Sequence, residues 1–402
     1  MNCIFRTVML ILPRTMIHAI IPNKTIPEVL KSDDESLKYQ IALSLVPGIG
    51  PVLAKNLVSY CGGVREVFNR SKIQLERIPG IGPERAGMIR HSIIMKRAEE
   101  ELVFIRTYGI KSLFYLDKAY PQRLSHCVDA PILMYFKGDC DLNAGRFIAV
   151  VGTRHATSYG REVTEKTIAD LAAFGVTIVS GLAYGIDIIA HRAAMEAGLG
   201  TVAVTAHGLD RIYPSLHKCT AEKMTMKGGV LSEYISGTMP DRENFPARNR
   251  IVAGMCDATI VVESAQRGGA LITADIANSY NRDVFAFPGR IHDAFSQGCL
   301  SLVKENKAML VCSADDIAKA LNWDIEGPLK KPEKSVQLNI FTSLSEEEQR
   351  ILNRLRESKL LHIDELALSL SVPLGKLSSI LLRLEFEGLI RALPGKRFEF
   401  VS

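Results

Sequence analysis

The 402-residue sequence lacks the patterns that mark a metalloprotein, a disulfide-bonded protein or a membrane protein. Its eight cysteines stand apart, without a CxxC pair or a histidine at ligand spacing, so we expect reduced thiols and no metal. An apolar run at residues 8–12 stops at Pro13, far short of the roughly 20 residues that a membrane helix needs. These absences favour a cytoplasmic protein that does not contact a membrane.

Strong charge of either sign is also missing. Lysine and arginine number 49 against 44 aspartates and glutamates, a net charge of +5. Such a mild excess leans toward anionic partners, but it does not separate a nucleic-acid binder from an ordinary enzyme. The length suggests two or three domains, so the placement of charges within each domain has to decide.

Residues 36–110 contain an internal duplication, LVPGIGPVLAKNLV and RIPGIGPERAGMIR. Each copy is a glycine-rich turn followed by a helical pattern, which resembles the helix-hairpin-helix motif. Turn amides at a helix start can grip a DNA phosphate, whereas a packing turn that contacts only protein is an open alternative. Residues 1–35 are expected to be a disordered extension or the product of a misassigned start. The turn glycines, expected at positive φ and as weak secondary DNA contacts, are Gly48, Gly50, Gly80 and Gly82.

The middle of the chain predicts an α/β fold with a Rossmann-like, doubly wound and mainly parallel sheet. Short β-rich runs alternate with helix-length segments, as parallel sheets require. We assign residues 111–322 to this extended domain and the Pro- and Lys-rich residues 323–342 to a linker. The predicted strands are FIAVVG, VTIVSG, TVAVTA, GVLSEY, ATIVVES and DVFAFPG.

Residues 343–402 predict a winged helix, because three helical patterns precede an alternating strand pair around Pro394-Gly395. The third helix, residues 374–387, carries Lys376 and Arg383 but also two glutamates. A reader of duplex DNA would arm this helix more strongly. We therefore favour a protein-contact role for the winged helix over duplex recognition.

Ligands of open parallel sheets bind beyond the carboxyl ends of the strands. Three predicted strands end there in turns rich in glycine and hydroxyl groups, which suit an anion. A further helix start, FPARNR, holds two arginines that oppose the helix dipole unless an anion lies nearby. The alternative for these arginines is ion pairing within the fold, with Asp241, Glu243 or Asp257 as partners.

A dinucleotide site is not indicated, because the GxGxxG fingerprint and the acidic residue closing the second strand are both missing. Several small turns along one edge suit a chain of phosphates better than one pyrophosphate, so we expect no cofactor. Aromatic residues beside the turns can stack on unpaired bases or simply belong to the core. They are Tyr159, Tyr184, Tyr213 and Phe245.

Acidic and histidine side chains near the strand ends show no catalytic spacing. Asp187 and His191 lie four residues apart on one helix and are expected to hydrogen-bond to each other. Glu263 precedes SAQRGGALITADIA, at the place where the lysine decarboxylase-like nucleoside-monophosphate phosphoribohydrolases carry PGGxGTxxE. The catalytic glutamate of that motif is missing here, so a nucleoside-phosphate-hydrolysing enzyme is the second-ranked function.

Five motifs resemble the DprA (Smf) family of DNA-processing proteins: VGTRHATSYGRE, SGLAYGIDIIAH, ENFPARNRIVAG, GGALITADIA and DVFAFPG. The resemblance covers residues 40–402. It implies a non-enzymatic, cytoplasmic protein of natural transformation, usually a homodimer formed through its Rossmann-like domain. Such a protein binds incoming single-stranded DNA, protects it and loads the RecA recombinase onto it.

The turns and the resemblance together predict a basic DNA pocket at the rim of the sheet. His217 and Gly268 depart from the family pattern, which often has Asn and Ser there, whereas Arg242 keeps the charge of a frequent lysine. The predicted DNA contacts are Gly152, Thr153, Arg154, Ser180, Gly181, Lys218, Arg242, Phe245, Arg248, Asn249, Arg250, Gly268 and Gly269.

Overall fold

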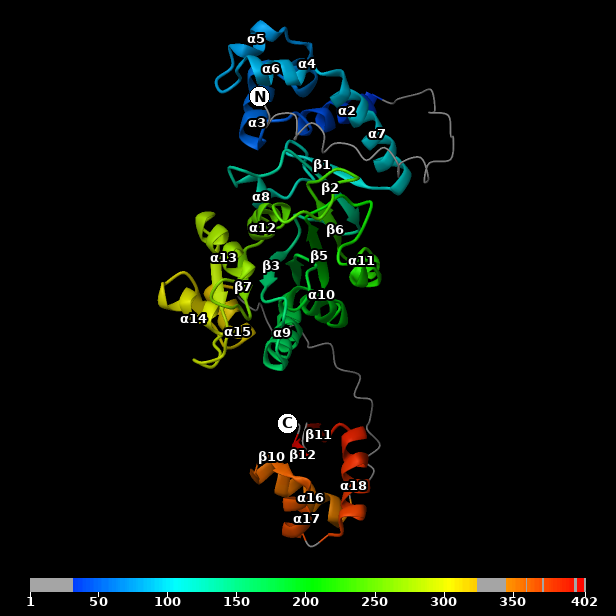
Figure 1. Cartoon of the computed structure of the whole chain (residues 1–402), viewed down its shortest axis with the longest axis vertical. Helices are drawn as coiled ribbons and strands as arrows, with labels where there is room; N and C mark the ends of the chain where they lie inside the picture. The colour runs from blue at the N-terminus through cyan, green and yellow to red at the C-terminus, as the bar shows by residue number, and fades with distance from the viewer. Residues whose placement is uncertain (1–31, 324–344, 359, 371, 394–395, 401–402) are drawn as a thin grey trace. The chain divides into compact units, whose positions relative to one another are not determined.

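The computed structural model describes residues 32–323, 345–358, 360–370, 372–393 and 396–400 (Figure 1). The chain divides into two compact units, with the boundary at Gly327. Each unit has its own hydrophobic core. Nearly all of the predicted extension at 1–35 and the predicted linker at 323–342 lie outside the described residues.

The first unit begins with a helical module in which both glycine-rich turns lead into helices that open with proline. Gly48 and Gly80 have φ of +74° and +84°, as predicted. The prediction is wrong for Gly50 and Gly82, whose φ values are −80° and −88°, because the chain is already extended where the helix begins. The helices are α2 (Ser32–Ser44), α3 (Pro51–Cys61), α4 (Val64–Asn69), α5 (Lys72–Glu76), α6 (Pro83–Ile89) and α7 (Ser92–Tyr108).

A nine-stranded sheet follows, in the order β1-β2-β6-β5-β4-β3-β7-β8-β9. The six predicted strands are confirmed, and all pairs among them are parallel. They are β3 (Arg146–Val151), β4 (Val176–Ser180), β5 (Gly200–Thr205), β6 (Gly229–Ser232), β7 (Ala258–Val261) and β8 (Asp283–Ala286). Three further strands were not predicted: β1 (Lys111–Phe114) and β2 (Leu133–Gly138), which form an antiparallel edge, and the short β9 (Met309–Leu310).

Helices cover both faces of this sheet, so the doubly wound prediction is confirmed. Successive strands run outward from β3 through β4 to one side, whereas β7 returns to pair with β3 on its other side. This reversal places a topological switch point at the carboxyl ends of β3 and β7, where ligands of such sheets bind. One face is covered by α9 (Ser158–Leu171), α10 (Ile186–Glu196), α11 (Lys218–Met224) and α15 (Ala314–Ala320), and the other by α8 (Gln122–Ser125), α12 (Asn244–Gly254), α13 (Gly269–Ser279) and α14 (Gln297–Lys304).

The second unit is a winged helix, as predicted, with an unpredicted strand β10 added to the wing. On its third helix, Lys376 pairs with Glu347 at 2.6 Å and Arg383 with Glu348 at 3.1 Å, so both charges are neutralised within the unit. The Pro394-Gly395 turn lies outside the described residues. The elements are α16 (Glu346–Ser358), β10 (Leu360–His362), α17 (Ile363–Leu370), α18 (Leu374–Phe386), β11 (Ile390–Leu393) and β12 (Arg397–Phe400).

Among the described helices, no single one is long and apolar enough to cross a bilayer. Only α17 and α18 taken together, bent by 113° between them, have that length and composition.

Candidate nucleic-acid interface

The turn after β3 is fixed between the end of β7 and the start of α10. The Thr153 N–H donates to the Glu263 carbonyl at 2.8 Å, and the Thr153 carbonyl accepts from the Ile186 N–H at 3.1 Å. Gly152 is required because a Cβ there would collide with the Ile186 side chain. These contacts hold Arg154 on an immobilised backbone while its side chain stays exposed.

The Glu263 carboxylate holds the same loop from beneath. It is buried and accepts from Thr157 twice, from the N–H at 3.0 Å and from the hydroxyl at 2.5 Å. Gly160 gives it room, since a Cβ at that position would overlap the carboxylate. Glu263 is therefore an internal anchor of the loop that carries Arg154, which leaves it poorly placed for acid–base chemistry on a bound ligand.

The turn after β4 binds an anion, but that anion is its own Asp187. The Asp187 carboxylate accepts from the N–H groups of Gly181 and Ala183 at 3.1 and 3.3 Å. Ser180 is fully buried, and its hydroxyl donates to the Val150 carbonyl at 2.6 Å. The Ser180 hydroxyl and the Gly181 amide are therefore both bonded inside the fold, and the DNA contacts expected of these two residues stay predictions.

Arg248 faces inward as well, and its predicted phosphate contact stays a prediction. The side chain is only 4% exposed, lies against Gly181 and donates to the Val204 carbonyl. Burial raises the pKa of the nearby Asp187 carboxyl, and the positive charge of Arg248 opposes that rise. Arg248 is the counter-charge of the buried Asp187.

Arg250 pairs with Glu233 at 2.5 Å and donates to the Asp129 carbonyl. Burial raises the pKa of the Glu233 carboxyl, again opposed by the arginine. The structure thus shows the ion pairing that was the alternative for this arginine, and the phosphate contact of Arg250 stays a prediction. The partner differs from the three aspartates and glutamates considered, of which Asp257 pairs with Arg123 at 2.6 Å.

His191 does not bond to Asp187, contrary to the sequence-based expectation. Its Nδ1 lies 2.7 Å from the Thr201 hydroxyl oxygen, and that hydroxyl donates onward to the Ile178 carbonyl at 3.0 Å. Nδ1 therefore carries the proton, and Nε2 is buried without a hydrogen-bond partner. Burial lowers the pKa of His191 to about 3, so this imidazole is neutral.

An outward-facing group remains, which we call the rim cluster: Arg154, Tyr213 and Phe245. The Arg154 guanidinium lies 5.4 Å from the centre of the Phe245 ring, a cation–π distance. The rings of Phe245 and Tyr213 are 6.1 Å apart, and Tyr213 is 46% exposed. The cluster joins the ends of β3 and β5 to the start of α12, and it presents a cation beside two aromatic rings.

Two further cations, Lys218 and Arg242, are exposed on segments that flank the rim cluster. Within residues 32–323 neither they nor Arg154 pair with a carboxylate within 4 Å. His217, beside Lys218, is buried and contacts the Leu182 carbonyl through Nδ1 at 2.8 Å. The unusual histidine therefore supports the second turn. Asn249 is half-buried, and its contact with DNA stays a prediction.

Gly268 and Gly269 lie in the third turn, which follows β7 and leads into α13. Gly268 lies against the Ser264 side chain, where a Cβ would collide, so a serine there would require Ser264 to move. Ser264 in turn bonds the Phe295 carbonyl at 2.7 Å and the Gly298 N–H at 2.8 Å. No hydrogen bond among the described residues joins Gly268 or Gly269 to the rim cluster, and their role in DNA binding stays a prediction.

The two helix-hairpin-helix turns contact each other. Arg85 donates to the Gly80 carbonyl at 2.7 Å and lies beside Gly48, and Gly80 packs on Leu53. Gly50 is exposed at the start of a helix with open space around it, as is Gly82 at the other turn. The first glycine of each turn therefore serves packing, and the second lies at an accessible helix start.

Comparison with known proteins agrees with this architecture in each of its three modules. Residues 111–322 match the family model of DNA recombination-mediator protein A, residues 342–396 the DprA winged helix domain, and residues 41–93 the SAM-like helix-hairpin-helix tandem. Fold and matches together define a three-module DNA-processing protein built around a Rossmann-like domain.

Individual relatives specify the family. Protein Smf of Synechocystis is 32% identical over 394 residues, covering 90% of this chain and 98% of that protein. DNA processing protein DprA of Bacillus subtilis is 37% identical over 237 residues, or 59% of this chain and 76% of its own length. The solved DprA of Streptococcus pneumoniae superposes with a TM-score of 0.60 at 35% identity, covering 70% of this chain and 97% of that chain. This chain belongs to the DprA (Smf) family.

Proposed function

We propose that this protein binds single-stranded DNA along the carboxyl rim of its sheet and does so without catalysing a reaction. The observation that carries the proposal is the rim cluster, in which an exposed guanidinium lies over the Phe245 ring and that ring lies beside the Tyr213 ring. A guanidinium suits phosphate oxygens, and aromatic rings stack on unpaired bases whatever their sequence. Duplex DNA, whose bases are already stacked, could use only the cation.

Lys218 follows Tyr213 by five residues and Arg242 precedes Phe245 by three, and both are exposed, so we propose them as further phosphate contacts beside the rim cluster. Several exposed cations suit a polynucleotide, because its backbone offers successive phosphates. The accessible helix starts at Gly50 and Gly82 are proposed as a weaker second contact with the DNA backbone.

The acidic side chains near the rim support binding rather than hydrolysis. Glu263 is held by Thr157, and Glu233 is held by Arg250. Asp187 is enclosed by turn amides. A general acid or base must reach the ligand, and each of these carboxylates is instead directed into the fold.

Membership of the DprA family extends the proposal to partners. We propose that the protein acts in the cytoplasm during natural transformation, protects incoming single strands and loads the RecA recombinase onto them. We further propose that it works as a homodimer formed through the Rossmann-like domain, with the winged helix contacting protein. Sedimentation velocity tests the dimer, and the rate of RecA filament growth on coated single strands tests the loading.

The DNA-binding proposal is tested by titrating the full chain with an oligo-dT and with a duplex of equal length at two salt concentrations. We expect tighter binding of the single strand and a steep loss with salt, with a log–log slope of about −0.7 for each phosphate neutralised. Equal affinity for the duplex, or binding that hardly responds to salt, would overturn the proposal.

A further inference from the structure

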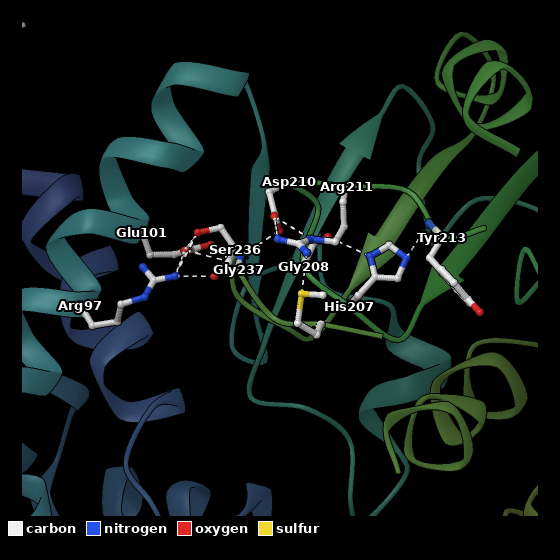
Figure 2. Close-up of polar contacts among 10 residues, drawn as sticks. Arg97, Glu101, His207, Gly208, Asp210, Arg211, Tyr213, Ser236 and Gly237 are labelled. Atoms are coloured by element: carbon white, nitrogen blue, oxygen red, sulfur yellow. Dashed lines mark hydrogen bonds and ion pairs between the residues drawn. The ribbon is translucent and has the colours of Figure 1, made fainter. Parts of the chain in front are cut away.

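A path of hydrogen bonds connects the helical module to the rim of the sheet (Figure 2). It starts at Glu101 on α7, whose carboxylate is 1% exposed. Glu101 accepts from the Ser236 N–H at 3.0 Å and from the Ser236 hydroxyl at 2.5 Å. Arg97, one turn earlier, binds Glu101 at 2.9 Å and the Ser236 carbonyl at 2.6 Å. Two charged side chains of α7 therefore satisfy every polar group of one residue in the loop after β6.

The loop after β6 is in turn fastened to the loop after β5. The N–H of Gly237, the residue after Ser236, donates to the Asp210 carboxylate at 2.9 Å. The Gly208 N–H donates to the Thr238 carbonyl at 3.2 Å, and a Cβ on Gly208 would collide with the opposing backbone. These bonds leave the two loops little freedom to move separately.

The last step leads from this loop pair to the rim cluster. His207 is fully buried, its Nδ1 lies 2.9 Å from the Gly208 carbonyl, and its Nε2 accepts from the Tyr213 N–H at 3.2 Å. The imidazole thus fixes the backbone that carries the Tyr213 ring. Figure 2 shows the labelled side chains from Arg97 to Tyr213 following one another across the two loops.

We propose that Glu101, assisted by Arg97, is a positioning residue of the DNA site. It acts on Tyr213 through the loop after β6 and the loop after β5. The inference rests on the proposed binding of single-stranded DNA at the rim cluster. It makes the helical module part of the site: without α7 bound to Ser236, the Tyr213 ring is no longer held beside Phe245.

The buried ion pair of Glu101 is better suited to positioning the Ser236 loop than to stabilising the contact between the helical module and the sheet domain. A buried ion pair adds little stability compared with apolar residues of the same size, because both charges lose their hydration. The pair instead fixes the position of one loop residue, because the hydrogen bonds of both side chains converge on Ser236. Leucine or valine at these positions would hold the modules together but would leave the Ser236 backbone unfixed.

The test replaces Glu101 by glutamine in the full chain, and it uses Glu100→Gln as the matched control. Glu100 is exposed and adjacent on α7, so the control makes the same charge change. Loss of a carboxylate alone should tighten DNA binding, whereas loss of positioning should weaken it. We expect Glu101→Gln to raise the Kd for oligo-dT about fivefold, a modest part of what stacking on one base supplies, and Glu100→Gln to leave it within about twofold.

The same substitution in a Tyr213→Ala background separates positioning from a general effect on the fold. If Glu101 acts through Tyr213, the Kd of the double variant should equal that of Tyr213→Ala within about twofold. Equal fold-changes in both backgrounds would overturn the inference. Should Glu101→Gln fail to fold, Ser236→Ala removes one bond of the same path, and we expect the same dependence on Tyr213.

This outcome is distinguishable from failure of the proposed function. A wild-type chain that does not bind oligo-dT removes the DNA site itself. A wild-type chain that binds while Glu101→Gln, correctly folded, binds equally well removes only the positioning role.

Discussion

Arg154 and Arg248 make an instructive comparison, because both stand at the carboxyl rim of the sheet and both seemed suited to phosphate. Arg154 points outward over the Phe245 ring, whereas Arg248 is buried against Gly181 and compensates the charge of Asp187. The rim therefore has an outward set of side chains and an inward set. The outward set should control DNA affinity with little effect on stability, and the inward set should do the reverse.

The largest effect is expected for Arg248→Ala. Removing the guanidinium leaves Asp187 buried without its counter-charge, and breaking such a pair costs about 3–5 kcal/mol. Urea unfolding should show this loss in the free energy of unfolding. Arg242→Ala, an exposed arginine on the preceding loop, is the control and should stay within about 0.5 kcal/mol of the wild type. Similar stability for both variants would show that the inward and outward sets do not differ.

The next effect concerns pH and another inward group, His191. Its pKa is lowered to about 3 by burial, whereas in the unfolded chain it is about 6.5. Below about pH 6.5 the imidazole is protonated in the unfolded state but stays neutral in the native state, so the free energy of unfolding falls as the pH falls. Between pH 7.5 and 5 this contribution is about 2 kcal/mol. Comparing urea unfolding at both pH values, we expect a smaller acid-induced loss in His191→Asn than in the wild type, and an identical loss would contradict the assignment.

A smaller effect is expected for Phe245→Leu in the outward set. Leucine keeps an apolar side chain but removes the ring on which a base and Arg154 can stack, at a cost of about 1–3 kcal/mol per base. We expect a Kd for oligo-dT raised about tenfold, with an unchanged unfolding midpoint, because the ring is only half-buried. An unaltered Kd would mean that Phe245 serves packing alone.

The sequence predicted the parallel sheet because each central strand is a short apolar run followed by helical periodicity. The strands β1 and β2 were not predicted. Residues 115–132 between them contain only the four-residue helix α8, so the alternation of strands with long helices is missing there. The sheet edge formed by these strands depends on pairing with β6, which lies about one hundred residues further along the chain.

For the site, the sequence located the rim but not the direction of its side chains. The inward position of Arg248 did carry a signal, because it shares the spacing i, i+3, i+4 and i+7 with the buried Ile251, Val252 and Met255. The bonds from Gly181 and Ala183 to Asp187 could also be suspected, because Asp187 follows these two residues by only six and four positions. The contact of Glu101 with Ser236 left no such trace, since the two residues are separated by 135 positions.

The central claim is that the outward cations at the rim bind the phosphates of single-stranded DNA. It is tested most directly by the salt dependence of oligo-dT binding in Arg154→Ala beside the wild type. We predict a Kd at least about tenfold higher, a log–log salt slope shallower by about 0.7 and an unchanged unfolding curve. A folded variant that keeps both the wild-type Kd and the wild-type slope would contradict the claim.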